Sequence, residues 1–100
     1  MATIAYRDIR VEDTEDIQLL PTDTWIQVFY GEDTTPSERG FYNSEERNLY
    51  GVGLTNGKAV EPLTYFVASY NKEGYFGMSS SHPHMEDNFP IDRSILLNGF

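Results

Sequence analysis

The chain contains no cysteine, few basic residues and no long hydrophobic run. Without cysteine it has no thiolate nucleophile, iron–sulfur cluster, cysteine-based zinc site or disulfide framework. No window approaches the roughly 18 apolar residues of a membrane span, and the first ten residues lack the apolar run of a secretory signal. We therefore expect a cytoplasmic protein that does not bind membranes.

The shortage of bases limits the partners. Seven lysines and arginines stand against 16 carboxylates, which gives a net charge of −9. The bases are scattered singly, whereas proteins that bind nucleic acid carry a basic stripe that replaces counterions on the phosphates. Direct binding to nucleic acid is not expected. The acids are concentrated instead, since positions 12–46 hold ten carboxylates and one base and so account for the whole net charge.

The apolar content is sufficient for one small core. Of the 100 residues, 39% are hydrophobic, including seven tyrosines, six phenylalanines and one tryptophan. A chain of this length forms one domain, here residues 1–100. Runs rich in β-branched and aromatic residues, or with alternating apolar residues, predict strands at 3–11, 24–30, 48–55, 63–70 and 75–79.

The segments between these runs predict turns and one helix. Acids in a first turn and a stop at Pro21 predict a short helix near residues 13–20, while 92–97 suits either a last helical turn or an edge strand. Asn56-Gly57 predicts a type I′ turn from which residues 58–60 return. The composition of 32–44 is that of a loop.

The predicted fold is mainly β, with α+β as the alternative. It is an antiparallel sheet of five or six strands, or a small barrel, with the one short helix near residues 13–20. Gly51 and Gly53 indicate a bulge or close packing within one of the strands.

Aromatic residues occur in adjacent pairs. The pairs are Phe29-Tyr30, Phe41-Tyr42, Tyr65-Phe66 and Tyr75-Phe76. Successive residues of a strand point to opposite faces, so each pair in a strand is expected to place one ring in the core and one outside. The outward rings have two interpretations: ordinary cross-strand packing, or anchors of a protein interface.

The acid-rich stretch also has two interpretations. It is either a solubilising surface or a negative patch that meets a basic groove on another protein. In the second case its charge density approaches that of duplex DNA, if the carboxylates share one side of the domain.

The segment His82-Pro83-His84 is the strongest chemical motif. In an extended chain two imidazoles at i and i+2 point to the same side, where Glu86 or Asp87 would add a third metal ligand. We favour a loop fixed by proline, because no later histidine completes the set. No metal, cofactor or catalytic residue is expected, and a small metal-dependent enzyme using His82 and His84 is a remote alternative.

In composition, the chain resembles the small, acidic inhibitors that phages and mobile elements deploy against defence nucleases, such as DNA-mimicking anti-restriction and anti-CRISPR proteins, and the immunity proteins of nuclease toxins. The resemblance implies a non-enzymatic module, a monomer or homodimer, that occupies the nucleic-acid surface of a basic protein. The expected contact residues are Glu12, Asp13, Glu15, Asp16, Glu32, Asp33, Glu38, Glu45, Glu46, Tyr30 and Tyr42. The alternative is a structural or assembly protein of a virion or homo-oligomer, which associates through a free sheet edge at 63–70.

Overall fold

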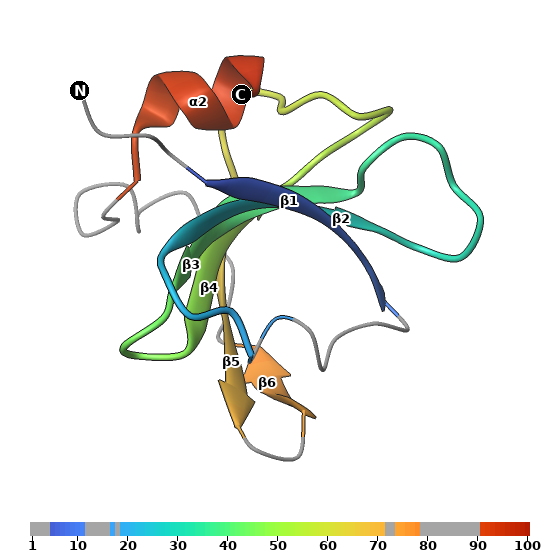
Figure 1. The fold of residues 1–100 in the computed structure, drawn as a ribbon. Helices are drawn as coiled ribbons and strands as arrows, with labels where there is room; N and C mark the ends of the chain where they lie inside the picture. The colour runs from blue at the N-terminus through green and yellow to red at the C-terminus, as the bar shows by residue number, and fades with distance from the viewer. Residues whose placement is uncertain (1–4, 12–16, 18, 72–73, 79–90) are drawn as a thin grey trace.

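The computed structural model describes residues 5–11, 17, 19–71, 74–78 and 91–100 (Figure 1). Its elements are β1 (Tyr6–Arg10), β2 (Thr24–Phe29), β3 (Glu38–Asn43), β4 (Asn48–Gly53), β5 (Tyr65–Asn71), β6 (Gly74–Met78) and α2 (Arg93–Asn98). The six strands lie side by side in sequence order, which confirms a mainly β fold. Among the described strands β1 and β6 do not pair, so they form an open sheet and not the alternative barrel.

The sheet is mixed. Neighbouring strands from β2 to β6 are antiparallel, as predicted, whereas β1 runs parallel to β2. A parallel neighbour requires a crossover of about a dozen residues, and residues 11–23 provide it. The helix predicted near 13–20 falls in this crossover, where residues 12–16 and 18 lie outside the described part. Of the two alternatives at 92–97, a last helical turn or an edge strand, the structure has the helix, as α2.

Two expectations for the middle of the chain are wrong. Residues 38–43, expected in a loop, form β3, which pairs with β2 and β4 on its two sides. The loop between β2 and β3 is therefore limited to residues 30–37. In addition, β5 pairs with β4 on one side and, from Ala68 to Asn71, with β6 on the other, so the free edge expected at 63–70 is wrong from residue 68 onward; the outermost strands of the described sheet are β1 and β6.

Both faces of the sheet carry buried core residues. Tyr65 and Phe66 are adjacent in β5 and point to opposite faces, yet both are buried. The expectation that each aromatic pair exposes one ring is therefore wrong here. One face holds a core cluster of Ile9, Ile17, Ile26, Val28, Tyr42, Leu49, Phe66, Ala68 and Tyr70. The other, which we call the helix face, holds Trp25, Val52, Leu63, Tyr65 and Leu96, the last contributed by α2.

The turn predicted at Asn56-Gly57 is confirmed. Both residues have positive φ, at 53° and 79°, as a type I′ turn requires. The backbones of Thr55 and Lys58 exchange two hydrogen bonds of 2.8 and 3.0 Å across the turn. Pairing beyond this isolated bridge does not extend through residues 59–60, which are not in a strand.

Candidate functional site

The described carboxylates of the acid-rich stretch lie at two opposite ends of the sheet. Because β2 and β3 are antiparallel, the loop at 30–37 and the turn at 44–47 are separated by the length of β3. The first end carries Glu32, Asp33 and Glu38, and the second carries Asp23, Glu45 and Glu46. Figure 1 shows the loop between β2 and β3 projecting beyond the sheet. The described carboxylates therefore do not form one continuous row.

Residues 30–37, which we call the acidic loop, are held in place by Arg10 at the end of β1. One guanidinium nitrogen, Nη1, donates to the carbonyls of Gly31, at 2.7 Å, and Asp33, at 3.3 Å. The guanidinium carbon also lies 5.4 Å from the centre of the Phe29 ring, in a cation–π arrangement. Since Arg10 binds backbone carbonyls, the carboxylates of Glu32 and Asp33 are left exposed at the tip.

Glu38 and Tyr30 form the base of the acidic loop. Glu38 is half-buried, and this burial raises the pKa of its carboxyl, an effect that a hydrogen bond from Tyr30 opposes. Tyr30 is 42% exposed, so it presents part of its ring to solvent while its hydroxyl is engaged. Of the predicted contact residues, the structure thus brings together Tyr30, Glu32, Asp33 and Glu38.

The turn at 44–47 uses its polar groups to stabilise itself. Asp23 Oδ1 accepts from the backbone N–H and the hydroxyl of Ser44, at 3.0 and 3.1 Å. Tyr50 donates its hydroxyl to Glu46 Oε1 at 2.7 Å, and Asn43 Oδ1 accepts from the Glu46 backbone N–H at 2.9 Å. Glu45 and Glu46 are exposed, but they lie at the opposite end of β3 from the acidic loop.

One predicted contact residue is placed in the core. The side chain of Tyr42 is 0% exposed, because β3 turns it into the cluster opposite the helix face. Its expected place on the surface is therefore wrong. The four predicted acids at 12–16, namely Glu12, Asp13, Glu15 and Asp16, lie outside the described residues, and so does the whole His82 to Asp87 segment. Within the described part, no group of three or more metal-ligating side chains occurs.

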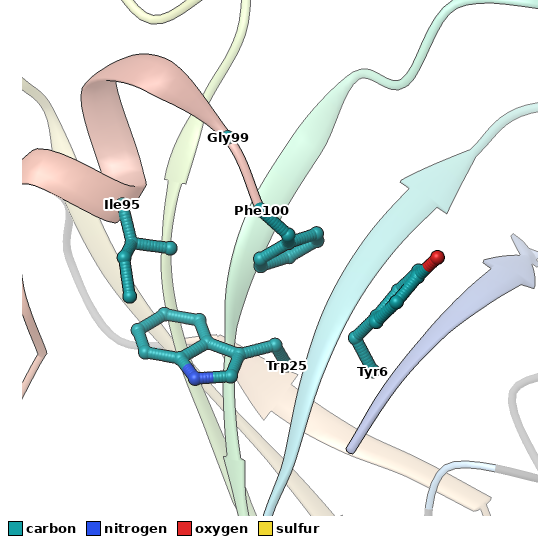
Figure 2. A pocket seen from close by; sticks show the side chains of 5 residues that line it. All are labelled: Tyr6, Trp25, Ile95, Gly99 and Phe100. Carbon is teal, nitrogen blue, oxygen red and sulfur yellow. The ribbon is translucent and has the colours of Figure 1, made fainter. Parts of the chain in front are cut away.

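An apolar pocket lies on the helix face at the start of β1 and β2 (Figure 2). Its volume is about 330 Å³, and its lining consists of Tyr6, Trp25, Ile95, Gly99 and Phe100. The Tyr6 and Phe100 rings are stacked with centroids 5.5 Å apart, and the Trp25 ring lies 5.7 Å from that of Phe100. Tyr6 and Phe100 are 63% and 47% exposed, so two aromatic rings form an open rim.

Arg39 contacts the segment that forms one wall of this pocket. It is only 6% exposed and donates to the carbonyls of Leu96, at 2.7 Å, and Gly57, at 3.3 Å. It thereby ties β3 to α2, and its guanidinium lies next to Gly99 of the pocket wall, where an added Cβ would be 3.4 Å from Nη2. Burial lowers the pKa of Arg39, although not enough to remove the charge of a guanidinium.

The pocket was not predicted from the sequence. Its residues come from the two ends of the chain and from β2, and only the parallel β1–β2 pairing, which sets Tyr6 opposite Trp25, brings them together. The one signal in the sequence was the single tryptophan, because tryptophan is enriched among the residues that carry the binding energy of protein interfaces.

Comparisons of the chain with protein-family models, with curated proteins and with solved structures found no match. Among the described residues, no helix is long and apolar enough to cross a membrane.

Proposed function

We propose that this protein is a non-enzymatic binding module that inhibits a basic, nucleic-acid-handling protein by occupying its nucleic-acid-binding surface. The observation that carries the proposal is the acidic loop, which exposes Glu32 and Asp33 on a projection whose backbone is fixed by Arg10. The proposal includes a location in the cytoplasm, where the protein would meet such a partner.

The fixed backbone supports a binding role for the loop. Ordering a flexible loop on association costs free energy, and a loop that is already held avoids most of that cost. Besides the two bonds from Arg10, the Asp33 N–H donates to the Tyr30 carbonyl and the Ser37 N–H to the Val28 carbonyl, at 3.0 and 2.8 Å. The loop can therefore present two carboxylates and part of the Tyr30 ring with little rearrangement.

The charge of the molecule supports a basic partner. A net charge of −9 on 100 residues attracts positive surfaces and repels nucleic acid. The described carboxylates lie at two separate ends of the sheet. This arrangement favours contact with the partner through one end of the sheet, and not through a continuous row of charges like that of duplex DNA. An inhibitor of this form excludes nucleic acid by charge and by volume, without copying the spacing of phosphates.

A capture experiment tests the proposal. The tagged protein is immobilised and exposed to a nuclease-treated lysate of its source organism, then washed with free duplex DNA or with about 0.5 M salt. We expect a basic nucleic-acid-binding protein to be retained and to be released by both washes. Retention only of further copies of the chain, unaffected by DNA, would contradict the proposal and favour the assembly role.

Two double variants locate the contact. Glu32→Lys with Asp33→Lys alters the acidic loop, and Glu45→Lys with Glu46→Lys makes the same change of charge at the opposite end. We expect the first to weaken the captured complex at least tenfold and the second only a few-fold. Equal weakening would show that the loop has no special role. Thermal unfolding confirms that both variants are folded.

A further inference from the structure

The pocket and the acidic loop are joined by a strip along β1 and β2, in which Tyr6 and Asp8 are exposed and Arg10 is partly exposed. Alternation places the residues of three cross-strand rows on the helix face. The rows are Tyr6 with Trp25, Asp8 with Gln27, and Arg10 with Phe29. Gln27 donates to Asp8 at 3.3 Å in the middle row, and Arg10 of the last row is the residue that holds the acidic loop. We call these rows together the β1–β2 strip.

The size of the strip suits one protein contact. Successive rows along a strand are about 6.6 Å apart, so the pocket lies about 13 Å from Arg10 and the base of the loop. A standard interface buries about 800 Å² on each partner, enough to cover this strip with the loop. A single partner therefore reaches both ends.

The lining of the pocket indicates what occupies it. Small-molecule sites enclose most of the ligand and orient it with a few well-placed polar groups. This pocket has an open rim and an almost wholly apolar lining, so it offers little to orient a free molecule. A side chain of a larger partner is oriented by its own backbone, and aromatic anchors in apolar pockets carry much of the binding energy of protein interfaces.

We propose that the pocket is the anchor site for an aromatic side chain of the basic partner, whose positive residues lie along the β1–β2 strip against Asp8, Glu32 and Asp33. All three carboxylates are exposed: Asp8 lies in the middle row of the strip, and Glu32 and Asp33 lie in the loop at its end. In an extended segment, a positive charge that meets Asp8 thus follows the anchor ring by about two residues, and the charges that meet the loop follow it by about four to six. This inference rests on the proposed function, of which it names the second contact.

Three synthetic peptides with blocked ends test the two contacts separately. The first is Phe-Gly-Ser-Gly-Lys-Lys-Lys, the second has alanine in place of phenylalanine, and the third has serine in place of each lysine. Each is titrated into the labelled full chain and followed by NMR. Trp25 gives the single indole N–H signal of the protein, the Gly99 amide reports on the pocket wall, and the Gly31 amide reports on the loop.

We expect the first peptide to move all three signals and to bind about fivefold more tightly than the alanine peptide. The serine peptide should move only Trp25 and Gly99. Equal affinity of the first two peptides, or unmoved Trp25 and Gly99 signals, would overturn the anchor site. Movement of Trp25 and Gly99 with no effect of the lysines at Gly31 would keep the anchor and overturn the acidic-loop contact, so the two failures are distinguishable.

A matched pair of variants completes the test. Tyr6→Ala removes one exposed ring of the rim, and Val60→Ala trims a side chain of similar exposure that does not line the pocket. The first should remove the advantage of the phenylalanine peptide, and the second should leave it unchanged. If both variants keep that advantage, the pocket does not hold the ring.

Discussion

Two buried polar side chains have an atom without a hydrogen-bond partner in the described part of the chain: Nε of Arg39 and the hydroxyl of Tyr42. An unpaired buried hydroxyl costs free energy, because water no longer solvates it and no protein group replaces the water. Burial also raises the pKa of Tyr42, an effect that the positive charge of Arg47 opposes. The buried ring of Tyr42 thus stabilises the folded state, whereas its unpaired hydroxyl destabilises it.

Removing that hydroxyl should stabilise the protein. We expect Tyr42→Phe to raise the free energy of unfolding by about 0.5 to 1 kcal/mol, because the ring stays and an unpaired polar atom leaves. Tyr50→Phe is the control, since it deletes the 2.7 Å bond to Glu46 and should cost about 0.5 to 1 kcal/mol. Urea unfolding measures both. A loss of stability in Tyr42→Phe would show that its hydroxyl has a partner.

At the scale of the elements, the backbones of β3 and β4 approach closely where two glycines face each other. Gly40 and Gly51 are register partners, and a Cβ on Gly51 would lie 2.7 Å from the Arg39 carbonyl and 2.9 Å from Cζ of Phe66. The Phe66 ring occupies the space that a side chain at Gly51 would need. Of the two alternatives predicted for Gly51 and Gly53, a bulge or close packing, close packing is confirmed for Gly51, whereas nothing lies within 4 Å of a Cβ added at Gly53.

A methyl group at this point should disrupt the sheet. Gly51→Ala must move either backbone or the Phe66 ring, so we expect a loss of about 2 to 4 kcal/mol in the free energy of unfolding. Gly53→Ala is the matched control in the same strand, because nothing lies within 4 Å of its added Cβ. It should change stability by less than about 0.5 kcal/mol. Thermal or urea unfolding of the two variants that gave equal losses would refute the close approach.

A strand was predictable from the sequence where its apolar residues follow the pattern that the sheet buries. The runs that became β2, β4 and β5 carry alternating or continuous apolar residues, and the sheet uses them in that way. β3 escaped prediction because its residues Glu38, Arg39 and Gly40 are typical of loops. They are tolerated in a central strand because Arg39 binds two distant carbonyls and Gly40 faces Gly51. These contacts exist only in the folded chain.

The candidate site was predictable only in part, for a related reason. Composition proposed the acids as candidates, since charge follows from residue type, but exposure does not: Tyr30 is 42% exposed, whereas Tyr42, proposed in the same way, is buried. The separation of Asp33 from Glu46, and the meeting of Tyr6 with Phe100, depend on strand order and on one parallel pairing. A sequence of alternating strands does not specify which neighbour is parallel, so the pocket could not be derived from it.

At the scale of the whole molecule, charge and contact are separate contributions to binding. Long-range attraction depends on the total charge and its field, and it acts mainly on the rate of association. A direct contact between a carboxylate and a partner base acts mainly on the rate of dissociation. The two ends of the sheet allow these contributions to be told apart, because Glu32 with Asp33 and Glu45 with Glu46 carry equal charge.

The rates of association and dissociation of the captured partner should therefore distinguish the two double variants. Each replacement of two carboxylates by lysines changes the net charge from −9 to −5. At low salt both should associate more slowly by similar factors, and at about 0.5 M salt this difference should vanish as charges are screened. Only the variant at Glu32 and Asp33 should dissociate faster, by about tenfold, because only it loses a direct contact. Surface plasmon resonance measures both rates. If neither variant dissociates faster, the acidic loop attracts the partner without touching it, and the contact must lie elsewhere on the molecule.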